Sequence, residues 1–188
     1  MKCLILHCSP RKNGVTSTLL SAMEKEAAKR YETVRLDVNS LAIKPCTGCL
    51  KCRPDKKCIL PADDAHRAGE LIRGSDLILI GCPTYWGNMT GPLKALFDRN
   101  VPVFEYIDGW TLKPMLRGKR ALLVVSSNVP FPLSLLSSQL GGTVRALKTV
   151  LKAGGVSVKG VLAVPNALSF DGKKDGLIAR AVRMVRSI

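Results

Sequence analysis

The sequence predicts an α/β fold in which one parallel sheet is covered by helices on both faces. Five short runs are mostly continuous in apolar character, which is typical of strands buried on both faces: 2–8, 33–38, 76–81, 119–126 and 156–164. Five other segments have the periodicity of amphipathic helices: 16–30, 63–73, 91–100, 142–153 and 175–186. Because strands and helices alternate along the chain, a parallel sheet is the expected arrangement.

The length of 188 residues fits one domain, residues 1–188, with a core that needs no covalent staples. The first apolar run is followed at once by Ser-Pro-Arg-Lys, and we expect it to be a strand and not a cleaved leader. No apolar run approaches the ~20 residues of a membrane-spanning helix. We therefore expect a cytoplasmic protein without a membrane, a compartment where close-spaced cysteines favour metal or redox chemistry over disulfides.

Residues 9–18 join the first strand to the first helix and are equipped to bind an anion. They supply hydroxyls, a glycine, two cations and backbone amides at a helix N-terminus, where the helix dipole attracts phosphate. The segment has neither the P-loop pattern nor the G-x-G-x-x-G of dinucleotide folds, so one phosphate of a mononucleotide fits better. The alternative is that its polar side chains only cap the helix.

Residues 82–90 follow the third strand and combine two aromatic rings, Tyr85 and Trp86, with an amide and a thioether. Such a segment is suited to hold a flat ring. The alternative is an ordinary turn whose aromatic rings pack at an oligomer interface. Ligands of open parallel sheets bind beyond the carboxyl ends of the strands, so we expect this loop, the first loop and residues 126–139 to share one site.

Four of the 7 cysteines form the pattern C-x2-C-x2-C-x5-C in the loop after the second strand: Cys46, Cys49, Cys52 and Cys58. This spacing indicates a metal centre at the same edge of the sheet. Zinc is one alternative, although structural zinc sites usually pair two separate C-x2-C knuckles. Thiols that bind no metal are the other alternative. The others, Cys3, Cys8 and Cys82, are expected to be small buried residues at strand ends.

The formal charge of +15 arises from 29 basic and 14 acidic side chains, and it should attract acidic partners. The basic residues are spread along the chain, few aromatic residues accompany them, and no nucleic-acid motif is present, so nucleic acid is not the expected partner. An acidic protein, an anionic ligand and a solvated basic surface are the three interpretations that this charge permits.

Other polar residues are predicted to be structural. Asp63 and Asp64 open a helix and should cap it, His7 should pack in the core, and His66 should lie on a helix surface. A helix-surface or subunit-contact position is expected for Lys94, Asp98 and Arg99. No Ser-His-Asp or paired-carboxylate constellation stands out, so no side chain is predicted to be catalytic, which suits an enzyme whose cofactor performs the redox step.

Over most of its length the chain resembles the iron–sulfur flavoprotein branch of the flavodoxin-like NAD(P)H-dependent FMN reductase superfamily. The motifs that carry the resemblance are Ser9-Pro10-Arg11-Lys12-Asn13-Gly14 with Thr16, Lys44-Pro45-Cys46-Thr47-Gly48-Cys49-Leu50-Lys51-Cys52 followed by Cys58 and Asp63-Asp64, Ser75-Asp76, Cys82-Pro83-Thr84-Tyr85-Trp86, and Leu93-Lys94 with Phe97-Asp98-Arg99. The chain departs from the usual pattern at His7-Cys8, Val15 and Cys82. The resemblance implies a three-layer α/β/α sandwich with strand order 2-1-3-4-5.

The resemblance also implies FMN, with its phosphate in the first loop and its ring against the second. The implied FMN-binding residues are Ser9, Arg11, Asn13, Gly14, Thr16, Ser17, Thr18, Pro83, Thr84, Tyr85, Trp86, Gly87, Asn88, Met89, Ser126, Ser127 and Asn128. It further implies a 4Fe-4S cluster in the loop 45–60, bound by the four thiolates of Cys46, Cys49, Cys52 and Cys58. The basic side chains expected to stabilise its charge are Lys51, Arg53, Lys56 and Lys57.

The expected function is electron transfer between the cluster and FMN. The resemblance implies a ferredoxin as donor, a quinone, oxygen or peroxide as acceptor, and a homodimer or homotetramer. An acidic ferredoxin would use the positive charge for docking, with the cysteine loop as the docking face. One alternative is a cluster-free FMN or quinone reductase with NAD(P)H as its substrate. The other is a non-catalytic flavodoxin-like module that binds acidic partners such as nucleic acid.

Overall fold

The five predicted strands form one parallel sheet in a computed structural model that describes residues 1–52, 57–136, 138–169 and 175–188. Their order is β2-β1-β3-β6-β7. When the five strands of this sheet are numbered 1 to 5 in chain order, this is the predicted order 2-1-3-4-5. The bounds are Lys2–His7 for β1, Glu32–Asp37 for β2, Leu77–Pro83 for β3, Arg120–Ser126 for β6 and Ser157–Val164 for β7. The flavodoxin-like topology is therefore confirmed.

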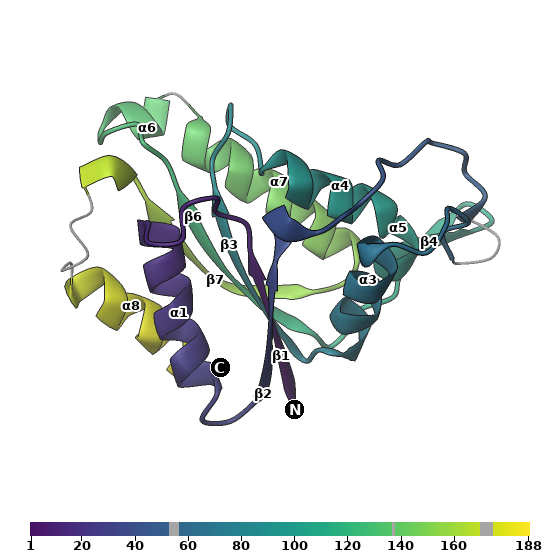
Figure 1. Cartoon of the computed structure of the whole chain (residues 1–188), viewed down its shortest axis with the longest axis horizontal. Helices are drawn as coiled ribbons and strands as arrows, with labels where there is room; N and C mark the ends of the chain where they lie inside the picture. The colour runs from purple at the N-terminus through teal and green to yellow at the C-terminus, as the bar shows by residue number, and fades with distance from the viewer. Residues whose placement is uncertain (53–56, 137, 170–174) are drawn as a thin grey trace.

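Helices cover both faces of this sheet (Figure 1). One face carries α1 (Val15–Ala27) and α8 (Asp175–Arg186), and the other carries α3 (Asp64–Gly74), α4 (Gly91–Arg99), α5 (Val101–Phe104) and α7 (Gln139–Ala153). Side chains alternate between the two cores, since Leu4 and Leu6 pack towards α3 and α4 while Cys3 and Ile5 pack towards α1 and α8. None of the helices in the described ranges is both long and apolar enough to cross a membrane.

Short helical turns complete the loops at the carboxyl ends of the strands. The turn η1 (Val38–Ser40) follows β2, α6 (Leu133–Leu136) follows β6, and η2 (Ala167–Ser169) follows β7. They hold the chain close to the edge of the sheet where a ligand is expected.

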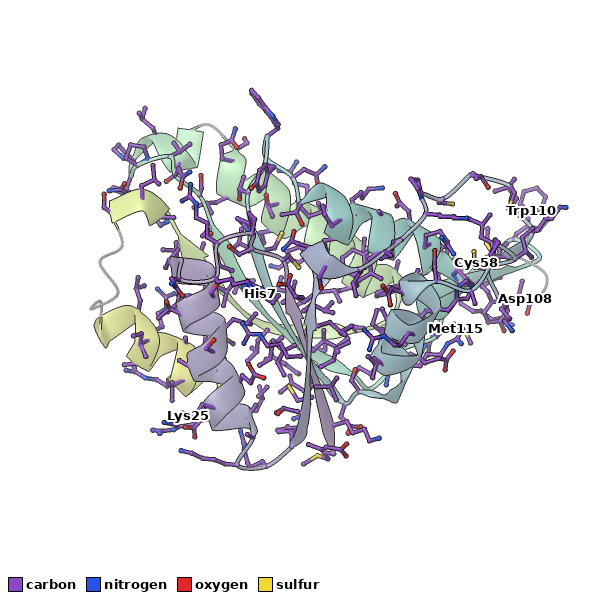
Figure 2. All side chains as sticks on the ribbon, in the orientation of Figure 1. His7, Lys25, Cys58, Asp108, Trp110 and Met115 are labelled. Carbon is purple, nitrogen blue, oxygen red and sulfur yellow. The ribbon has the colours of Figure 1, made fainter. Side chains whose placement is uncertain are left out.

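A two-stranded antiparallel hairpin, which the sequence analysis does not predict, projects from one end of the molecule. It consists of β4 (Glu105–Asp108) and β5 (Thr111–Pro114). The pairing of Asp108 with Thr111 leaves Gly109 and Trp110 as the turn, and Gly109 has the positive φ of +59° that such a tight turn favours. Trp110 is fully exposed at the tip (Figure 2).

The predicted capping and core roles of several polar residues are confirmed. Asp63 is the N-cap of α3, accepts a hydrogen bond from the amide of Ala65 at 3.0 Å, and forms a capping box with His66. His7 is buried at the end of β1, and its Nε2 lies 2.7 Å from the hydroxyl of Ser17. That contact ties β1 to the first turn of α1 and so fixes the loop between them.

Candidate functional site

A cavity of about 400 Å³ opens where β1, β3 and β6 end. It brings together three loops that are far apart in the sequence, as expected for the carboxyl edge of a parallel sheet. The described residues that line this flavin cavity, as we call it below, are Ser9, Pro10, Arg11, Gly14, Val15, Thr16, Pro83, Thr84, Tyr85, Trp86, Ser126, Ser127, Asn128 and Ala167.

The first loop presents an open helix N-terminus to this cavity. Gly14 is the N-cap of α1 and makes no side-chain capping bond, so the amides of the first helical turn keep their capacity to bind an anion. Ser17 donates to the carbonyl of Arg11 at 2.5 Å, and the amide of Arg11 donates to the hydroxyl of Ser9 at 3.2 Å. Among the described lining residues Arg11 is the only charged one. The loop therefore favours a phosphate group.

The second loop is a tight turn that holds an indole beside the cavity. Tyr85 and Asn88 exchange two backbone hydrogen bonds of 2.9 Å, and the residues between them, Trp86 and Gly87, have φ values of +52° and +73°. A bulky residue such as Trp86 rarely adopts this left-handed backbone conformation. Because its side chain is 96% exposed, the indole is available to a planar ligand at the rim.

The third loop closes the cavity with polar side chains from the end of β6 and the two residues that follow it. The hydroxyl of Thr16 lies 2.7 Å from that of Ser126, which joins the first helix to the end of β6. The amide of Ala167 donates to the carbonyl of Ser127 at 2.9 Å, so η2 is held against the same strand end. The side chain of Asn128 is exposed there. These groups can meet the polar edge of a ring or a sugar chain.

The cysteine loop leaves the sheet edge after η1 and is anchored by a buried arginine. The side chain of Arg99 has no exposed area, and its guanidinium donates to Asp63 Oδ2 at 2.6 Å, to the carbonyl of Lys44 at 2.7 Å and to Cys58 Sγ at 3.4 Å. The prediction that Arg99 lies on the helix surface is wrong, because α4 turns this residue inwards beneath the loop. Lys94 and Asp98 do form an exposed pair at 2.5 Å.

The four thiols of the cysteine loop differ in exposure but influence one another. Cys46 and Cys49 are exposed, whereas Cys52 and Cys58 are partly buried. Burial raises the pKa of Cys52, and the neighbouring thiols of Cys58, Cys49 and Cys46 raise it further. Gly48 and Leu50, on either side of Cys49, both have left-handed backbones, which curves the chain at this point. All four thiols therefore share one electrostatic neighbourhood.

The four thiols match a cluster in number. In the described part of the chain no group of three or more His, Cys, Asp or Glu side chains is close enough to hold one metal ion. A 4Fe-4S cluster takes one thiolate at each of four separate irons and uses the whole set of four cysteines. Of the basic residues expected around it, Arg53 and Lys56 lie outside the described residues.

A second and wider cavity of about 960 Å³ lies beside Cys58, between the cysteine loop, α3 and α5. It shares none of its described lining residues with the flavin cavity. Figure 2 shows Cys58 on the side of the molecule that carries Trp110, away from His7 at the end of β1. The cysteine loop thus begins at the predicted edge of the sheet but carries its last thiol to a different face.

Comparison with known proteins identifies the family. A family model described as NADPH-dependent FMN reductase matches residues 1–168. The chain belongs to the NADPH-dependent FMN reductase family. This match covers every segment that lines the flavin cavity, and it confirms the resemblance on which the FMN prediction depends.

Several iron–sulfur flavoproteins are relatives of this chain. The iron-sulfur flavoprotein of Methanosarcina thermophila is 30% identical over 151 residues, which is 80% of this chain and 71% of that protein. One from Archaeoglobus fulgidus is 32% identical over 120 residues, which is 63% of this chain and 51% of the relative. One from Clostridioides difficile is 35% identical over 98 residues, 50% of this chain and 44% of the relative. The chain spans about half the length of the last two.

The Methanosarcina match places the chain in the iron–sulfur flavoprotein branch, as predicted. Solved structures agree on the fold. Smu.1420 from Streptococcus mutans UA159 has a TM-score of 0.80 at 18% identity, with all of both chains covered. An azoreductase from Bacillus anthracis str. Sterne has a TM-score of 0.74 at 13% identity and covers all of this chain and 97% of its own.

Most of the residues predicted to bind FMN line the cavity, and the others, except Asn13, lie behind its lining. Gly87 donates to the side chain of Gln139 at 2.9 Å, Asn88 accepts from the amide of Met89 at 2.8 Å, and Met89 is buried. Ser17 and Thr18 bond to backbone carbonyls of the first loop. Asn13 is exposed outside the lining. Sequence reasoning missed Pro10, Val15 and Ala167, which line the cavity without a polar group that would have signalled them.

Proposed function

We propose that the chain is an FMN-dependent redox protein that transfers electrons between FMN in the flavin cavity and a 4Fe-4S cluster held by the cysteine loop. The observation that carries this proposal is one fold with two sites, an open helix N-terminus at a polar cavity and a four-thiol loop anchored by Arg99. The names of the relatives in the iron–sulfur branch support it.

In this proposal the first-turn amides of α1 and the guanidinium of Arg11 hold the phosphate. The second loop presents Tyr85 and Trp86 to the ring, and Thr84 with residues 126–128 offers hydrogen bonds to polar atoms. Bound FMN would supply both one-electron and two-electron transfer. The role of the chain is to hold the ring at the strand ends and to shield one side of it from water.

The cluster would be held by Cys46, Cys49, Cys52 and Cys58. The hydrogen bond from Arg99 to Cys58 would stabilise the negative charge of the bound thiolate, and such N–H···S contacts raise the reduction potential of clusters. Lys51 and Lys57 add positive charge along the same loop. These positive charges would thereby make it easier for the cluster to take up an electron, and a cluster takes up one electron at a time.

The direct test is anaerobic purification followed by counts of iron, sulfide and FMN. We expect about four irons and four sulfides per chain with one FMN. Cys52→Ser should lose most of the iron and keep FMN, because the flavin cavity does not include this loop. Cys3→Ala, a buried change on the α1 side of the sheet, should keep both and serves as the control. Bound FMN without iron in the unchanged chain would disprove the cluster.

We propose an acidic donor such as a ferredoxin and a small acceptor such as a quinone, oxygen or peroxide. The wide cavity beside Cys58 is lined by Lys57, Arg67 and Arg73, with Glu70 as its one acidic residue among those described. Together with the net charge of +15, this surface should steer an acidic partner towards the cluster.

If charge steers the donor to the protein, the rate of reduction by ferredoxin should depend on the salt concentration. Raising the ionic strength from about 0.01 to 0.15 M shortens the screening length from about 30 to 8 Å and should slow reduction by ferredoxin several-fold. Stopped-flow absorbance at the flavin band measures this rate, with dithionite as the small-molecule control donor. A ferredoxin rate that does not change with salt would contradict docking by charge.

A cluster-free NAD(P)H-dependent FMN or quinone reductase is the second candidate. It is favoured by the exposure of Cys46 and Cys49 to solvent. Rapid NAD(P)H oxidation by iron-free protein would support it.

We also propose a homodimer or homotetramer. Large apolar side chains are exposed at several places, among them Trp86 at the rim of the flavin cavity and Trp110, Ile107 and Leu112 on the hairpin. Burial of such surfaces is what stabilises subunit contacts.

A further inference from the structure

Cys8 and Cys82 lie side by side beneath the flavin cavity. They belong to neighbouring parallel strands, since His7 pairs with Gly81 and the amide of Cys8 donates to the carbonyl of Gly81 at 2.9 Å. Neighbouring strands are about 4.8 Å apart, and disulfides join Cα atoms about 4.4 to 6.8 Å apart. Cys8 lies one residue beyond the end of β1.

Both side chains point to the same face and are closed to solvent. Each is 0% exposed and packs in the core towards α3, α4 and α7. The following residues, Ser9 and Pro83, line the flavin cavity, so the pair lies one residue behind its wall. Neither thiol has a role in the FMN or cluster sites described above.

The surroundings of the two thiols make them unequal. The thiol of Cys8 interacts with that of Cys82 and lowers its pKa against the opposing effect of burial, and the amide and hydroxyl of Thr90 lower it further. For Cys8, burial and the neighbouring Cys82 raise the pKa. Because the amide and hydroxyl of Thr90 act on Cys82 and not on Cys8, Cys82 is the sulfur that more readily becomes a thiolate.

The buried hydroxyl of Thr90 is the geometric observation beside this pair of thiols. It is the N-cap of α4 but makes no side-chain capping bond, and among the described residues its Oγ1 is the one buried side-chain oxygen or nitrogen with no hydrogen-bond partner. Thr90 is only 4% exposed, so water does not occupy its hydroxyl. The hydroxyl can therefore stabilise negative charge on Cys82. A helix N-terminus lowers the pKa of a nearby cysteine and so favours its thiolate, which is the nucleophilic form.

We propose that Cys8 and Cys82 form a dithiol–disulfide pair that reduces hydrogen peroxide. The Cys82 thiolate attacks one peroxide oxygen, the O–O bond breaks, and the other oxygen leaves as water with the proton that the thiol gave up. The Cys8 sulfur then attacks the sulfur of the resulting sulfenic acid, the S–O bond breaks, and a second water takes the Cys8 proton. Two thiols lose two electrons and become a disulfide, and the peroxide becomes two waters.

The burial of the pair determines which oxidants it accepts. A small neutral molecule can reach the core during brief local opening, whereas glutathione disulfide or a bulky alkylating reagent cannot. We therefore expect the two thiols to resist iodoacetamide in the folded protein, under conditions where the exposed Cys46 and Cys49 are alkylated when they carry no cluster.

Peptide mapping tests the proposal. The anaerobically purified Cys3→Ala chain is treated with graded hydrogen peroxide in the presence of a chelator, quenched in acid, unfolded, alkylated and digested with trypsin. The expected product is a disulfide between residues 3–11 and 74–94, which in this variant contain Cys8 and Cys82 as their only cysteines. Recovery of both peptides alkylated and unlinked, or of Cys82 as sulfinic acid with Cys8 still reduced, would overturn the proposal.

Matched variants assign the two roles. In Cys8→Ser, Cys82 should stop at a sulfenic acid, which dimedone traps when the treated protein is unfolded in its presence, and in Cys82→Ser, Cys8 should stay reduced. Thr90→Val should slow disulfide formation about three- to tenfold, which is the effect of one lost hydrogen bond, while Thr90→Ser retains the rate. Equal rates in Thr90→Val and Thr90→Ser would remove Thr90 from the mechanism. The iron and FMN content of each variant shows whether an effect arises from the other sites.

Discussion

Replacing Arg99 by methionine is expected to destabilise the FMN-free chain by about 3 kcal/mol and to lower its iron content sharply. Burial tends to raise the pKa of Asp63, but the hydrogen bonds from Arg99 and from the amides of Lys44 and Ala65 outweigh it and hold the pKa low. Without Arg99 this carboxylate, whose side chain is 12% exposed, would remain charged and poorly solvated. The uncompensated charge is the main cost of the substitution.

The iron content should fall because Arg99 also holds the cysteine loop. The same guanidinium bonds to the carbonyl of Lys44 at the start of the cysteine loop and to Cys58 at its end. Removing it takes away one hydrogen bond at each end of the loop, and at the start only the amide contacts of Ala42 and Lys44 with Asp64 and Asp63 remain, so the four thiols would be less well ordered for the cluster. Urea unfolding of the FMN-free protein measures the first effect, and iron per chain after anaerobic purification measures the second.

Two variants of the same region are the controls. Lys94→Met removes the exposed partner of Asp98 from the same helix and should change stability by about 0.5 kcal/mol or less. Arg99→Met combined with Asp63→Asn should lose less than the sum of the two single changes, because the unpaired charge is gone. If Arg99→Met behaved like Lys94→Met, the anchoring role of Arg99 would be refuted.

The sheet and its loops were predictable because their signals are local. Each central strand is a continuous apolar run, as in residues 76–81, and a helical pattern follows it. This alternation predicts a parallel sheet covered by helices on both faces. The polar loops at the strand ends were found by composition for the same reason. The strand order came from the family resemblance and was confirmed by the structure.

The features that were missed depend on partners distant in the sequence. Arg99 stands three residues after the buried Leu96, on the inward side of α4, but its partner Asp63 is 36 residues away, and no local pattern joins them. The hairpin had a local signal in Gly109, because glycine is favoured at the first of the two central positions of a tight hairpin turn. Its strands are largely exposed, however, and lack the apolar runs by which the other strands were identified.

Replacing Gly142 by alanine is expected to weaken FMN binding by about tenfold or more, or about 1.4 kcal/mol. A Cβ atom at this position would lie 2.2 Å from the carbonyl oxygen of Gly87, a backbone atom that can move only with the whole second loop. The loop is held to α7 from two sides, since Gly87 donates to Gln139 at 2.9 Å and Thr143 donates to Thr84 at 3.1 Å. Relieving the clash requires these contacts to lengthen and displaces Tyr85 and Trp86 from the cavity rim.

The neighbouring glycine is a closely matched control. A Cβ atom at Gly141 meets nothing within 4 Å, so Gly141→Ala adds the same methyl group to the same helix without touching the loop. It should leave FMN affinity unchanged and raise stability by about 0.5 to 1 kcal/mol, because alanine restricts the unfolded chain more than glycine does. Gly142→Ala should lose stability by about 1 to 3 kcal/mol, as overpacked positions do. Titration of FMN by fluorescence quenching and thermal unfolding separate the two variants, and equal affinities would show that α7 does not position the second loop.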